Sequence, residues 1–285
     1  KIKSSQIPKE GLFGLHNCNL IFCRHDCPQL YGALLMRVAL LIDYDGTNYN
    51  GWQRQKNGIG IQEIIQNALK EITGEEINLR AAGRTDAGVH AKGQVADFDT
   101  SSTIPGDKFL YPLNNILPDD IRIMASAQVA DDFSARFDAL EKHYQYRVYL
   151  GEVLPATEGR NAALYDRKIN LELMRVAGEI MEGEHDFKAF EGPYAQMPTS
   201  VRRVNKVDVN VQGNFLIFDI YGEAFLKNMI RIMVGTILKI NEGRLSLEGL
   251  MDLFQRPDRQ QAGITMPAKG LTMISILYNN LEFRV

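Results

Sequence analysis

Residues 76–99 read EINLRAAGRTDAGVHAKGQVADFD and contain two alternating runs separated by a glycine-flanked loop. Apolar and polar residues alternate on both sides of the loop, which is the two-residue period of a half-buried β-strand. The sequence therefore predicts strands at 76–82 and 93–99, and it places the carboxylate of Asp86 in the loop just after the first strand ends.

The loop around Asp86 is suited to close approach by a ligand. Gly83 lies three residues before Asp86 and Gly88 two residues after it. Glycine lets the backbone turn tightly and leaves no side chain in the way. An aspartate in such a turn also often hydrogen-bonds its own backbone as an Asx turn. The local pattern alone therefore supports a structural role and a chemical role about equally.

Periodicity predicts the remaining elements outward from this loop. The expected strands are 37–44, 120–129, 143–150, 204–211, 215–221 and 271–278, and the expected helices are 60–72, 105–116, 170–182, 224–241 and 246–255. Pro105 suits an early helix position, and Gln212-Gly213-Asn214 suits a hairpin turn. Helices among hairpins indicate an α+β fold with largely antiparallel sheets flanked by helices.

The chain has 285 residues, more than a single hydrophobic core usually organises. We expect an N-terminal extension at 1–35 that is dispensable for folding and activity, an N-terminal α/β domain at 36–140 carrying the Asp86 loop, and a C-terminal α/β domain at 141–285. The extension holds five possible metal ligands: His16, Cys18, Cys23, His25 and Cys27. Their spacing lacks a Cys-x-x-Cys pair, so we expect unpaired thiols rather than zinc.

Composition and charge bound the classes of function. Hydrophobic residues make up 45% and charged residues 24%, as in ordinary globular proteins. No apolar run reaches the roughly 18–20 residues of a membrane span, and no signal-peptide pattern is present, so we expect no membrane association and no secretion. The net charge of −3 gives no global sign of nucleic-acid binding.

Local basic groups are present, and each alone is more often a solvated face than a phosphate contact. They are Arg80 and Arg84; Arg136; Lys142, His143 and Arg147; Arg202, Arg203 and Lys206; and Lys227 and Arg231.

Nine consecutive residues at 83–91, Gly-Arg-Thr-Asp-Ala-Gly-Val-His-Ala, resemble the active-site motif of the TruA-type tRNA pseudouridine synthases. The resemblance extends in order from residue 37 to residue 278. It includes Tyr44-Asp45-Gly46-Thr47, Gly51-Trp52-Gln53-Arg54-Gln55, Gly60-Ile61-Gln62-Glu63, Asp132-Phe133-Ser134-Ala135-Arg136-Phe137, Tyr144-Gln145-Tyr146-Arg147, Arg231, Val234, Gly235 and Lys269-Gly270-Leu271. A match of this length and order is hard to attribute to chance.

The resemblance implies a pseudouridine-synthase-like fold of two α/β domains, with their sheets forming a continuous base and an active cleft between them. It implies isomerisation of uridine to pseudouridine in the tRNA anticodon stem-loop, at tRNA positions 38, 39 and 40, on a flipped-out uridine. It further implies a cytoplasmic homodimer in which each tRNA touches both subunits. The isomerisation loses no group and has no net redox change, so we expect neither metal nor organic cofactor.

The resemblance also assigns roles to five residues. Asp86 is the catalytic aspartate, which can attack C6 of the ring, attack the sugar C1′, or abstract a sugar proton. Arg231 is the cation that pairs with it, and Arg84 helps displace the nucleotide and hold its phosphates. Tyr144 packs against the uracil ring, and Leu271 forms an apolar pocket wall.

Plainer interpretations of these residues remain open at this point. By pattern alone, Arg231 can be a solvated helix residue, and Tyr144 and Leu271 can be ordinary core residues. His90 suggests acid–base chemistry, but we expect it to be structural or to contact phosphate.

Three alternative functions make different demands on the sequence. A non-catalytic RNA-binding protein needs no carboxylate in the loop, and a related enzyme can act at another uridine. A phosphate-handling hydrolase needs a phosphate loop or a cluster of acidic residues beside Asp86, and the sequence has neither.

Overall fold

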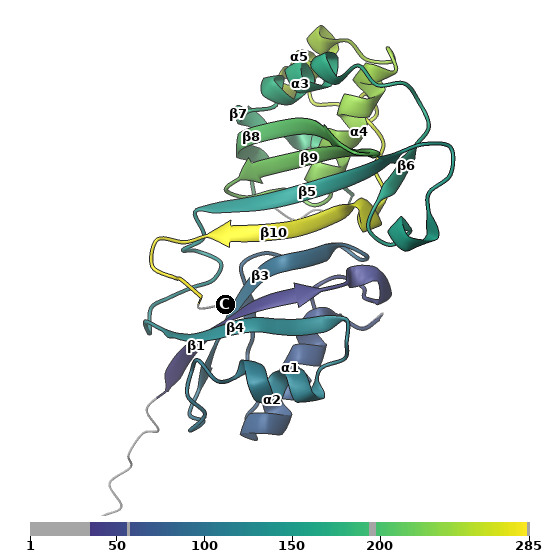
Figure 1. Ribbon diagram of the computed structural model, residues 1–285. Helices are drawn as coiled ribbons and strands as arrows, with labels where there is room; N and C mark the ends of the chain where they lie inside the picture. Colours follow the sequence, from purple (N-terminus) through teal and green to yellow (C-terminus); the bar gives the residue numbers. More distant parts are fainter. Residues whose placement is uncertain (1–34, 56–57, 194–197, 284–285) are drawn as a thin grey trace, which may run out of the picture. The chain divides into compact units, whose positions relative to one another are not determined.

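The computed structural model describes residues 35–55, 58–193 and 198–283 (Figure 1). The predictions made for residues 1–34, including the zinc alternative at the three cysteines, lie outside the described residues. The described residues after position 34 belong to one compact unit.

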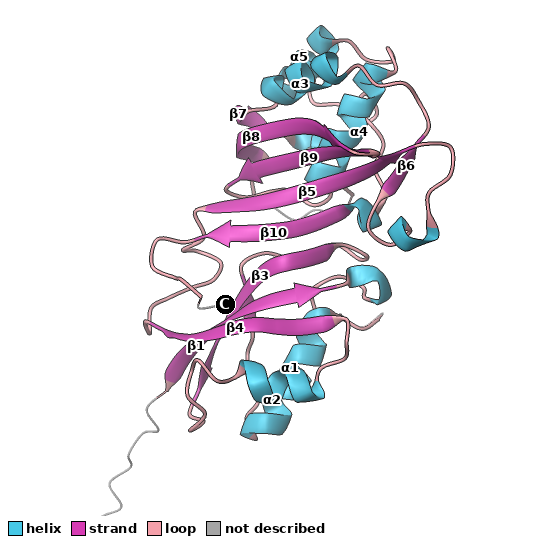
Figure 2. Ribbon diagram, in the orientation of Figure 1, coloured by secondary structure: helices cyan, strands magenta, loops and turns pink. Residues whose placement is uncertain are grey.

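One ten-stranded sheet forms the centre of this unit, with strand order β4-β1-β3-β10-β5-β9-β8-β7, and with β2 paired to β3 and β6 paired to β5. The strands are β1 (Met36–Tyr44), β2 (Arg80–Ala81), β3 (His90–Thr100), β4 (Ile121–Val129), β5 (Glu141–Leu150), β6 (Ala163–Tyr165), β7 (Gly183–Asp186), β8 (Val201–Gln212), β9 (Phe215–Gly222) and β10 (Leu271–Leu277). Only β10–β3 and β5–β6 pair in parallel among the described strands. The predicted α+β fold with a largely antiparallel sheet is confirmed (Figure 2).

Five described α-helices accompany the sheet: α1 (Ile61–Thr73), α2 (Leu110–Ile116), α3 (Leu171–Ile180), α4 (Met229–Asn241) and α5 (Leu247–Gln255). The ends of these helices have local causes. Gly74, at φ +75°, ends α1 in the left-handed conformation that glycine adopts without strain. The side chains of Asn170 and Ser246 accept backbone N–H groups at the starts of α3 and α5. None of the helices in the described ranges is both long and apolar enough to cross a lipid bilayer.

The last strand joins the two parts of the sheet. β10 lies between β3 and β5, parallel to β3 through Thr272–His90 and antiparallel to β5 through Leu271–Tyr146 (Figure 1). The predicted domain boundary at residue 140 falls between β4 and β5. That division into two domains stays a prediction.

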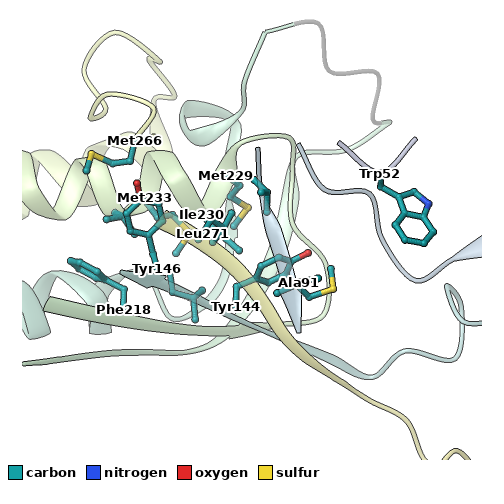
Figure 3. Packing of buried hydrophobic residues seen from close by; sticks show 14 of the residues in the cluster. Trp52, Ala91, Tyr144, Tyr146, Phe218, Met229, Ile230, Met233, Met266 and Leu271 are labelled. Carbon is teal, nitrogen blue, oxygen red and sulfur yellow. The ribbon is translucent and has the colours of Figure 1, made fainter. Parts of the chain in front are cut away.

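The main core lies between the sheet and the helices. Inward residues of β1, such as Leu40, pack with Ile61 and Ile65 of α1, and Tyr146 and Leu271 belong to the same cluster as residues of α4 (Figure 3). A smaller cluster includes Ala39, Ala82, Val95, Phe133, Ala135 and Tyr278. Ala39 and Val95 are in it, whereas the adjacent Leu40 and Ala96 belong to the main core, so this cluster lies on the opposite face of the sheet.

Two predicted elements near the site are shorter than expected. The strand predicted at 76–82 is reduced to Arg80–Ala81. Gln62 and Gln66 of α1 donate to the carbonyls of Leu79 and Ile77 at 2.9 and 2.8 Å, so side chains replace a partner strand there. The helix predicted at 224–241 begins only at Met229, because Asn228 has φ +60° and cannot continue a right-handed helix.

The helix predicted at 105–116 begins only at Leu110. Gly106 lies close to β4, where an added Cβ would meet Gln128 Cβ at 2.7 Å, and residues 105–108 form a turn instead. Pro112, not Pro105, is the proline in the first helical turn, where a missing N–H costs nothing. The short strands β6 and β7 were not predicted, since three or four residues carry little periodic signal.

Candidate active site

Asp86 lies in the loop between β2 and β3, with its side chain 27% exposed. Val89 N–H donates to the Asp86 carbonyl at 3.1 Å and closes a turn, in which Gly88 has φ +76°. The Asp86 carboxylate makes no hydrogen bond to its own turn within the described residues, so an Asx turn is not what positions it. The side chain instead points away from the turn toward a cation.

Residues 44–52 hold the Asp86 loop in place. Trp52 N–H donates to the Thr85 carbonyl at 3.1 Å, and the hydroxyls of Tyr44 and Thr85 are hydrogen-bonded at 2.8 Å. Gly51, at φ +86°, lies so near the loop that an added Cβ would come within 2.5 Å of the Thr85 oxygen. No local pattern assigns these residues a role beyond the resemblance, because the contact depends on the folded chain.

Arg231 reaches Asp86 from the first turn of α4. Its Nη1 is 3.5 Å from Asp86 Oδ2. Two shorter bonds fix the same guanidinium: Nε donates to the Met266 carbonyl at 2.6 Å, and Nη1 donates to Asn228 Oδ1 at 2.8 Å. The Arg231 side chain is only 15% exposed, so the solvated-face interpretation is wrong. The structure brings Arg231 and Asp86 together, as the resemblance implied.

Tyr144 lies in β5 opposite Met273 of β10 and Ile220 of β9, and it is 7% exposed. Its ring meets the ring of Phe225 edge-on at 5.4 Å. Burial raises the pKa of Tyr144, and the nearby Tyr44 and Asp86 raise it further, so its phenol stays protonated. Met273, opposite Tyr144, has its Cε 3.9 Å from the position of a Cβ on Gly83, so this buried ring lies near the loop. Tyr144 is therefore a core residue near the Asp86 loop, and Figure 3 shows it among buried apolar side chains.

Leu271 is buried at the start of β10, paired with Tyr146 of β5. The Tyr146 hydroxyl donates to the Pro267 carbonyl at 2.6 Å, next to the Met266 carbonyl that holds Arg231. Residues 266–271 thus connect the carbonyl that holds Arg231 to the buried Leu271. Sequence reasoning did not assign roles to Tyr146, Met266 or Asn228; the first was part of the resembling segment, whereas the other two gave no signal.

Arg84 and His90 flank Asp86 and differ in their environments. Arg84 is exposed and has no hydrogen-bond or ion-pair partner in the part of the chain that the structure describes. His90 is buried: its Nδ1 accepts from Gly46 N–H at 3.0 Å and lies 3.1 Å from Asp45 Oδ1, and its Nε2 is 2.8 Å from the Arg160 carbonyl. Both ring nitrogens of His90 are engaged by the protein, which fits a structural role, one of the two roles expected for it.

Several of the basic side chains noted in the sequence lie within ion-pair distance of a carboxylate. The pairs are Arg80 with Asp97 and Asp99, His143 with Asp219, Arg147 with Glu158, Arg203 with Glu184 and Glu223, and Lys206 with Asp208. Arg84, Arg136, Lys142, Arg202 and Lys227 have no carboxylate within ion-pair distance among the described residues. Of these, Arg84 lies in the Asp86 loop, and Lys142 Nζ lies 3.9 Å from the position of a Cβ on Gly83. No group of three or more candidate metal ligands occurs in residues 35–55, 58–193 and 198–283.

Comparison with known proteins identifies the family. Residues 40–138 and 177–279 match the sequence profile described as tRNA pseudouridine synthase. The chain belongs to the tRNA pseudouridine synthase family.

Curated tRNA pseudouridine synthases agree over most of the chain. The protein of Acetivibrio thermocellus that is named tRNA pseudouridine synthase A is 41% identical to this chain over 244 residues. The match covers 86% of this chain and 100% of the relative. The protein of Pelobacter propionicus with the same name is 39% identical, over 85% of this chain and 99% of the relative. Among solved structures, a Cbf5–Nop10–Gar1 complex matches with TM-score 0.34 and 14% identity, over 83% of this chain and 58% of that chain, which is too distant to carry an argument.

Membership of the tRNA pseudouridine synthases defines the reaction. The protein is an isomerase that converts uridine to pseudouridine in tRNA. The bond from C1′ to N1 breaks, a bond from C1′ to C5 forms, and the proton of C5 is lost while N1 gains one. The alternatives of a hydrolase and of a non-catalytic RNA-binding protein are excluded by this membership.

Proposed function

We propose that Asp86 is the catalytic carboxylate and that the enzyme acts on uridines 38, 39 and 40 in the anticodon stem-loop of tRNA. The observation that carries the first part is the position of Asp86: its carboxylate is partly exposed on the motif loop and is held by the guanidinium of Arg231 at 3.5 Å. The target position rests on the resemblance of the sequence to TruA-type enzymes.

A carboxylate can start this isomerisation by attacking C6 of the ring, by attacking C1′ of the sugar, or by removing a sugar proton. Each route needs an ionised Asp86 in a site that excludes much of the water, and a fixed cation favours that state. Arg231 is held by Met266 and Asn228 as well, so it stays in place whichever atom the carboxylate approaches. The three routes remain open.

The remaining site residues act on the substrate. Tyr144 and Leu271 offer apolar surface to the uracil ring beside Asp86, with the target uridine turned out of its stack. Arg84, exposed and without an acid partner in the described part of the chain, contacts RNA phosphate, where a guanidinium can bond with two oxygens at once. A cytoplasmic homodimer that shares each tRNA completes the proposal, and it rests on the resemblance alone.

The test is conversion of an unmodified tRNA transcript, mapped nucleotide by nucleotide, with no metal added. Asp86→Asn is compared with Asp166→Asn, which changes an exposed carboxylate outside the site. We expect conversion at positions 38–40 by wild type and Asp166→Asn and none by Asp86→Asn, with the Kd for tRNA within about tenfold, roughly 1.4 kcal/mol.

Turnover by Asp86→Asn would overturn its catalytic role. Conversion only at uridines outside the anticodon stem-loop would overturn the proposed target. The enzyme would then be a tRNA pseudouridine synthase that modifies another position of tRNA.

A further inference from the structure

Phe137 is the most exposed large hydrophobic residue that the structure describes, at 79%. It follows Arg136, whose guanidinium carbon lies 5.3 Å from the centre of the Phe137 ring. An exposed ring leaves apolar surface in contact with water, and this costs the folded protein free energy that a cation over the ring offsets only in part. Such a pair is typical of surfaces that bind bases of single-stranded nucleic acid, where rings stack and cations meet phosphates.

The loop that carries Phe137 is firmly anchored beneath it. Ala135 N–H donates to Asp97 Oδ1 at 2.9 Å, and the Tyr278 hydroxyl donates to the Ala135 carbonyl at 2.6 Å. The guanidinium of Arg37 donates to the Phe133 carbonyl at 2.7 Å. Residues of β1 and β3 and the residue after β10 therefore hold this loop. Phe137 follows an anchored segment of the chain.

Positive charge gathers beside this ring without matching negative charge. Arg136 and Lys142 have no carboxylate partner among the described residues, and Lys142 is only 9% exposed. Burial, and then the proximity of Arg136, lowers the pKa of Lys142 to about 8. Asp138, the acid nearest to Arg136 in sequence, accepts the Ser134 N–H at 2.8 Å, and Glu141, next to Lys142, accepts from Asn205 Nδ2 at 2.7 Å. Two neighbouring cations without an acid fit an anionic ligand.

This surface adjoins the Asp86 loop. A Cβ on Gly83 would lie 3.9 Å from Lys142 Nζ, and Gly83 is three residues before Asp86. Ala82 and Ala135 belong to the same buried cluster, so the loop carrying Phe137 packs against the residues that lead into the Asp86 loop. RNA bound at Asp86 therefore has this surface within reach of its neighbouring nucleotides.

We propose that Phe137, Arg136 and Lys142 form a second nucleotide site, where an unpaired base of the tRNA other than the isomerised uridine stacks on Phe137 and its phosphate meets Arg136 and Lys142. The inference rests on the proposed placement of catalysis at Asp86. Its role is binding, so it predicts a change in KM and not in kcat.

The experiment measures total pseudouridine formed from an unmodified tRNA transcript, whichever uridine reacts. Phe137→Ala and Phe137→Leu are compared with Phe137→Trp. The matched control is Tyr111→Ala, since Tyr111 is 60% exposed on α2 with Lys108 Nζ 5.8 Å from its ring centre. Melting temperatures verify that each variant is folded. Because Phe137 is 79% exposed, we expect its replacement to leave the fold intact.

We expect Phe137→Ala and Phe137→Leu to raise KM by about tenfold or more with kcat unchanged, because the stacking partner is lost. Phe137→Trp and Tyr111→Ala keep the wild-type KM. Arg136→Ala lowers the slope of log KM against log salt by about one, whereas Phe137→Ala leaves that slope unchanged.

A wild-type KM for Phe137→Ala would overturn the inference, and so would a wild-type KM for Phe137→Leu, which keeps apolar bulk without the ring. Neither result depends on which uridine is converted or on the outcome for Asp86→Asn. Failure of this inference is therefore distinguishable from failure of the proposed function.

Discussion

Arg231 meets Asp86 at 3.5 Å, yet it is held more closely by groups other than Asp86. Its bonds to the Met266 carbonyl at 2.6 Å and to Asn228 Oδ1 at 2.8 Å are both shorter. The guanidinium is thus fixed by the protein before any substrate arrives, and its contact with the carboxylate is the longest of the three. A cation positioned in advance stabilises charge without reorganising during the reaction.

Replacing Arg231 tests this arrangement. Arg231→Ala should lower kcat/KM by about 30- to 150-fold, since a charge-assisted hydrogen bond of about 2–3 kcal/mol is lost. Arg231→Lys should fall in between, because it keeps the charge but not the several donors that bond Met266 and Asn228. Arg244→Ala, on an exposed arginine, is the control. Steady-state kinetics on unmodified tRNA decide, and full activity of Arg231→Ala would show that Asp86 does not depend on this cation.

Gly51 should be needed for the position of the Asp86 loop. Gly51→Ala puts a Cβ 2.5 Å from the Thr85 oxygen at φ +86°, whereas Gly74→Ala has a similar φ of +75° and nothing within 4 Å. Gly74→Ala should cost only the backbone strain, about 1–2 kcal/mol, and keep wild-type kcat. Gly51→Ala should cost about 1–3 kcal/mol more and lower kcat by about 100-fold, because the loop must shift. Urea unfolding measures the loss of stability, and steady-state kinetics measure the loss of kcat. Equal losses in the Gly51 and Gly74 variants would contradict a role for the close contact between Gly51 and Thr85.

Lys142 should make stability depend on pH in the alkaline range. Its pKa is lowered from 10.5 to about 8, so between these values the unfolded chain binds a proton that the folded chain does not. Stability should rise with pH there, by up to roughly 1.4 kcal/mol per pH unit. Below pH 8 both states are charged and the burial cost is present in full.

Lys142→Met should therefore be more stable than wild type at pH 7, and the difference should shrink as pH rises through 8 toward 10.5. Lys168→Met, on an exposed lysine, is the control. Urea unfolding from pH 7 to 10 gives the curves, and a stability difference that stays constant with pH would refute this account of Lys142.

A chain beginning at Met36 should fold and react as the full chain does. β1 begins at Met36, Leu35 before it is 61% exposed, and the curated relatives are matched in full by about 86% of this chain. We expect kcat/KM within about twofold and a melting temperature within about 2 °C. A chain beginning at Leu40 is the comparison, since it removes part of β1 and should be clearly less stable. Loss of activity in the Met36 chain would assign residues 1–35 a role.

The parts of this fold that the sequence predicted are those decided locally. β1, β3 and the β8–β9 hairpin follow from alternation, and α1 follows from its amphipathic pattern and its terminal glycine. β2 was predicted too long because glutamines of α1 take the carbonyls of Ile77 and Leu79. No local pattern reveals such a replacement.

The site divides in the same way. Asp86, Arg84 and Arg231 were predicted as site residues from the motif and its resemblance. Asn228 at φ +60° and the Met266 carbonyl were not found, because a backbone conformation and a backbone acceptor leave no mark on residue type. Phe137 was part of a resembling segment, but only the folded structure reveals its exposure.

The pairing of β10 with β3 has a consequence for synthesis on the ribosome. The strand that follows Asp86 is made early, but its parallel partner at Thr272 and Met273 and the cation at Arg231 emerge near the end of translation. A nascent chain thus carries its carboxylate loop long before the site is assembled, with one edge of β3 waiting for a partner. We therefore expect activity to begin only when almost the whole polypeptide has left the exit tunnel, because only then can β10 pair with β3 and Arg231 reach Asp86.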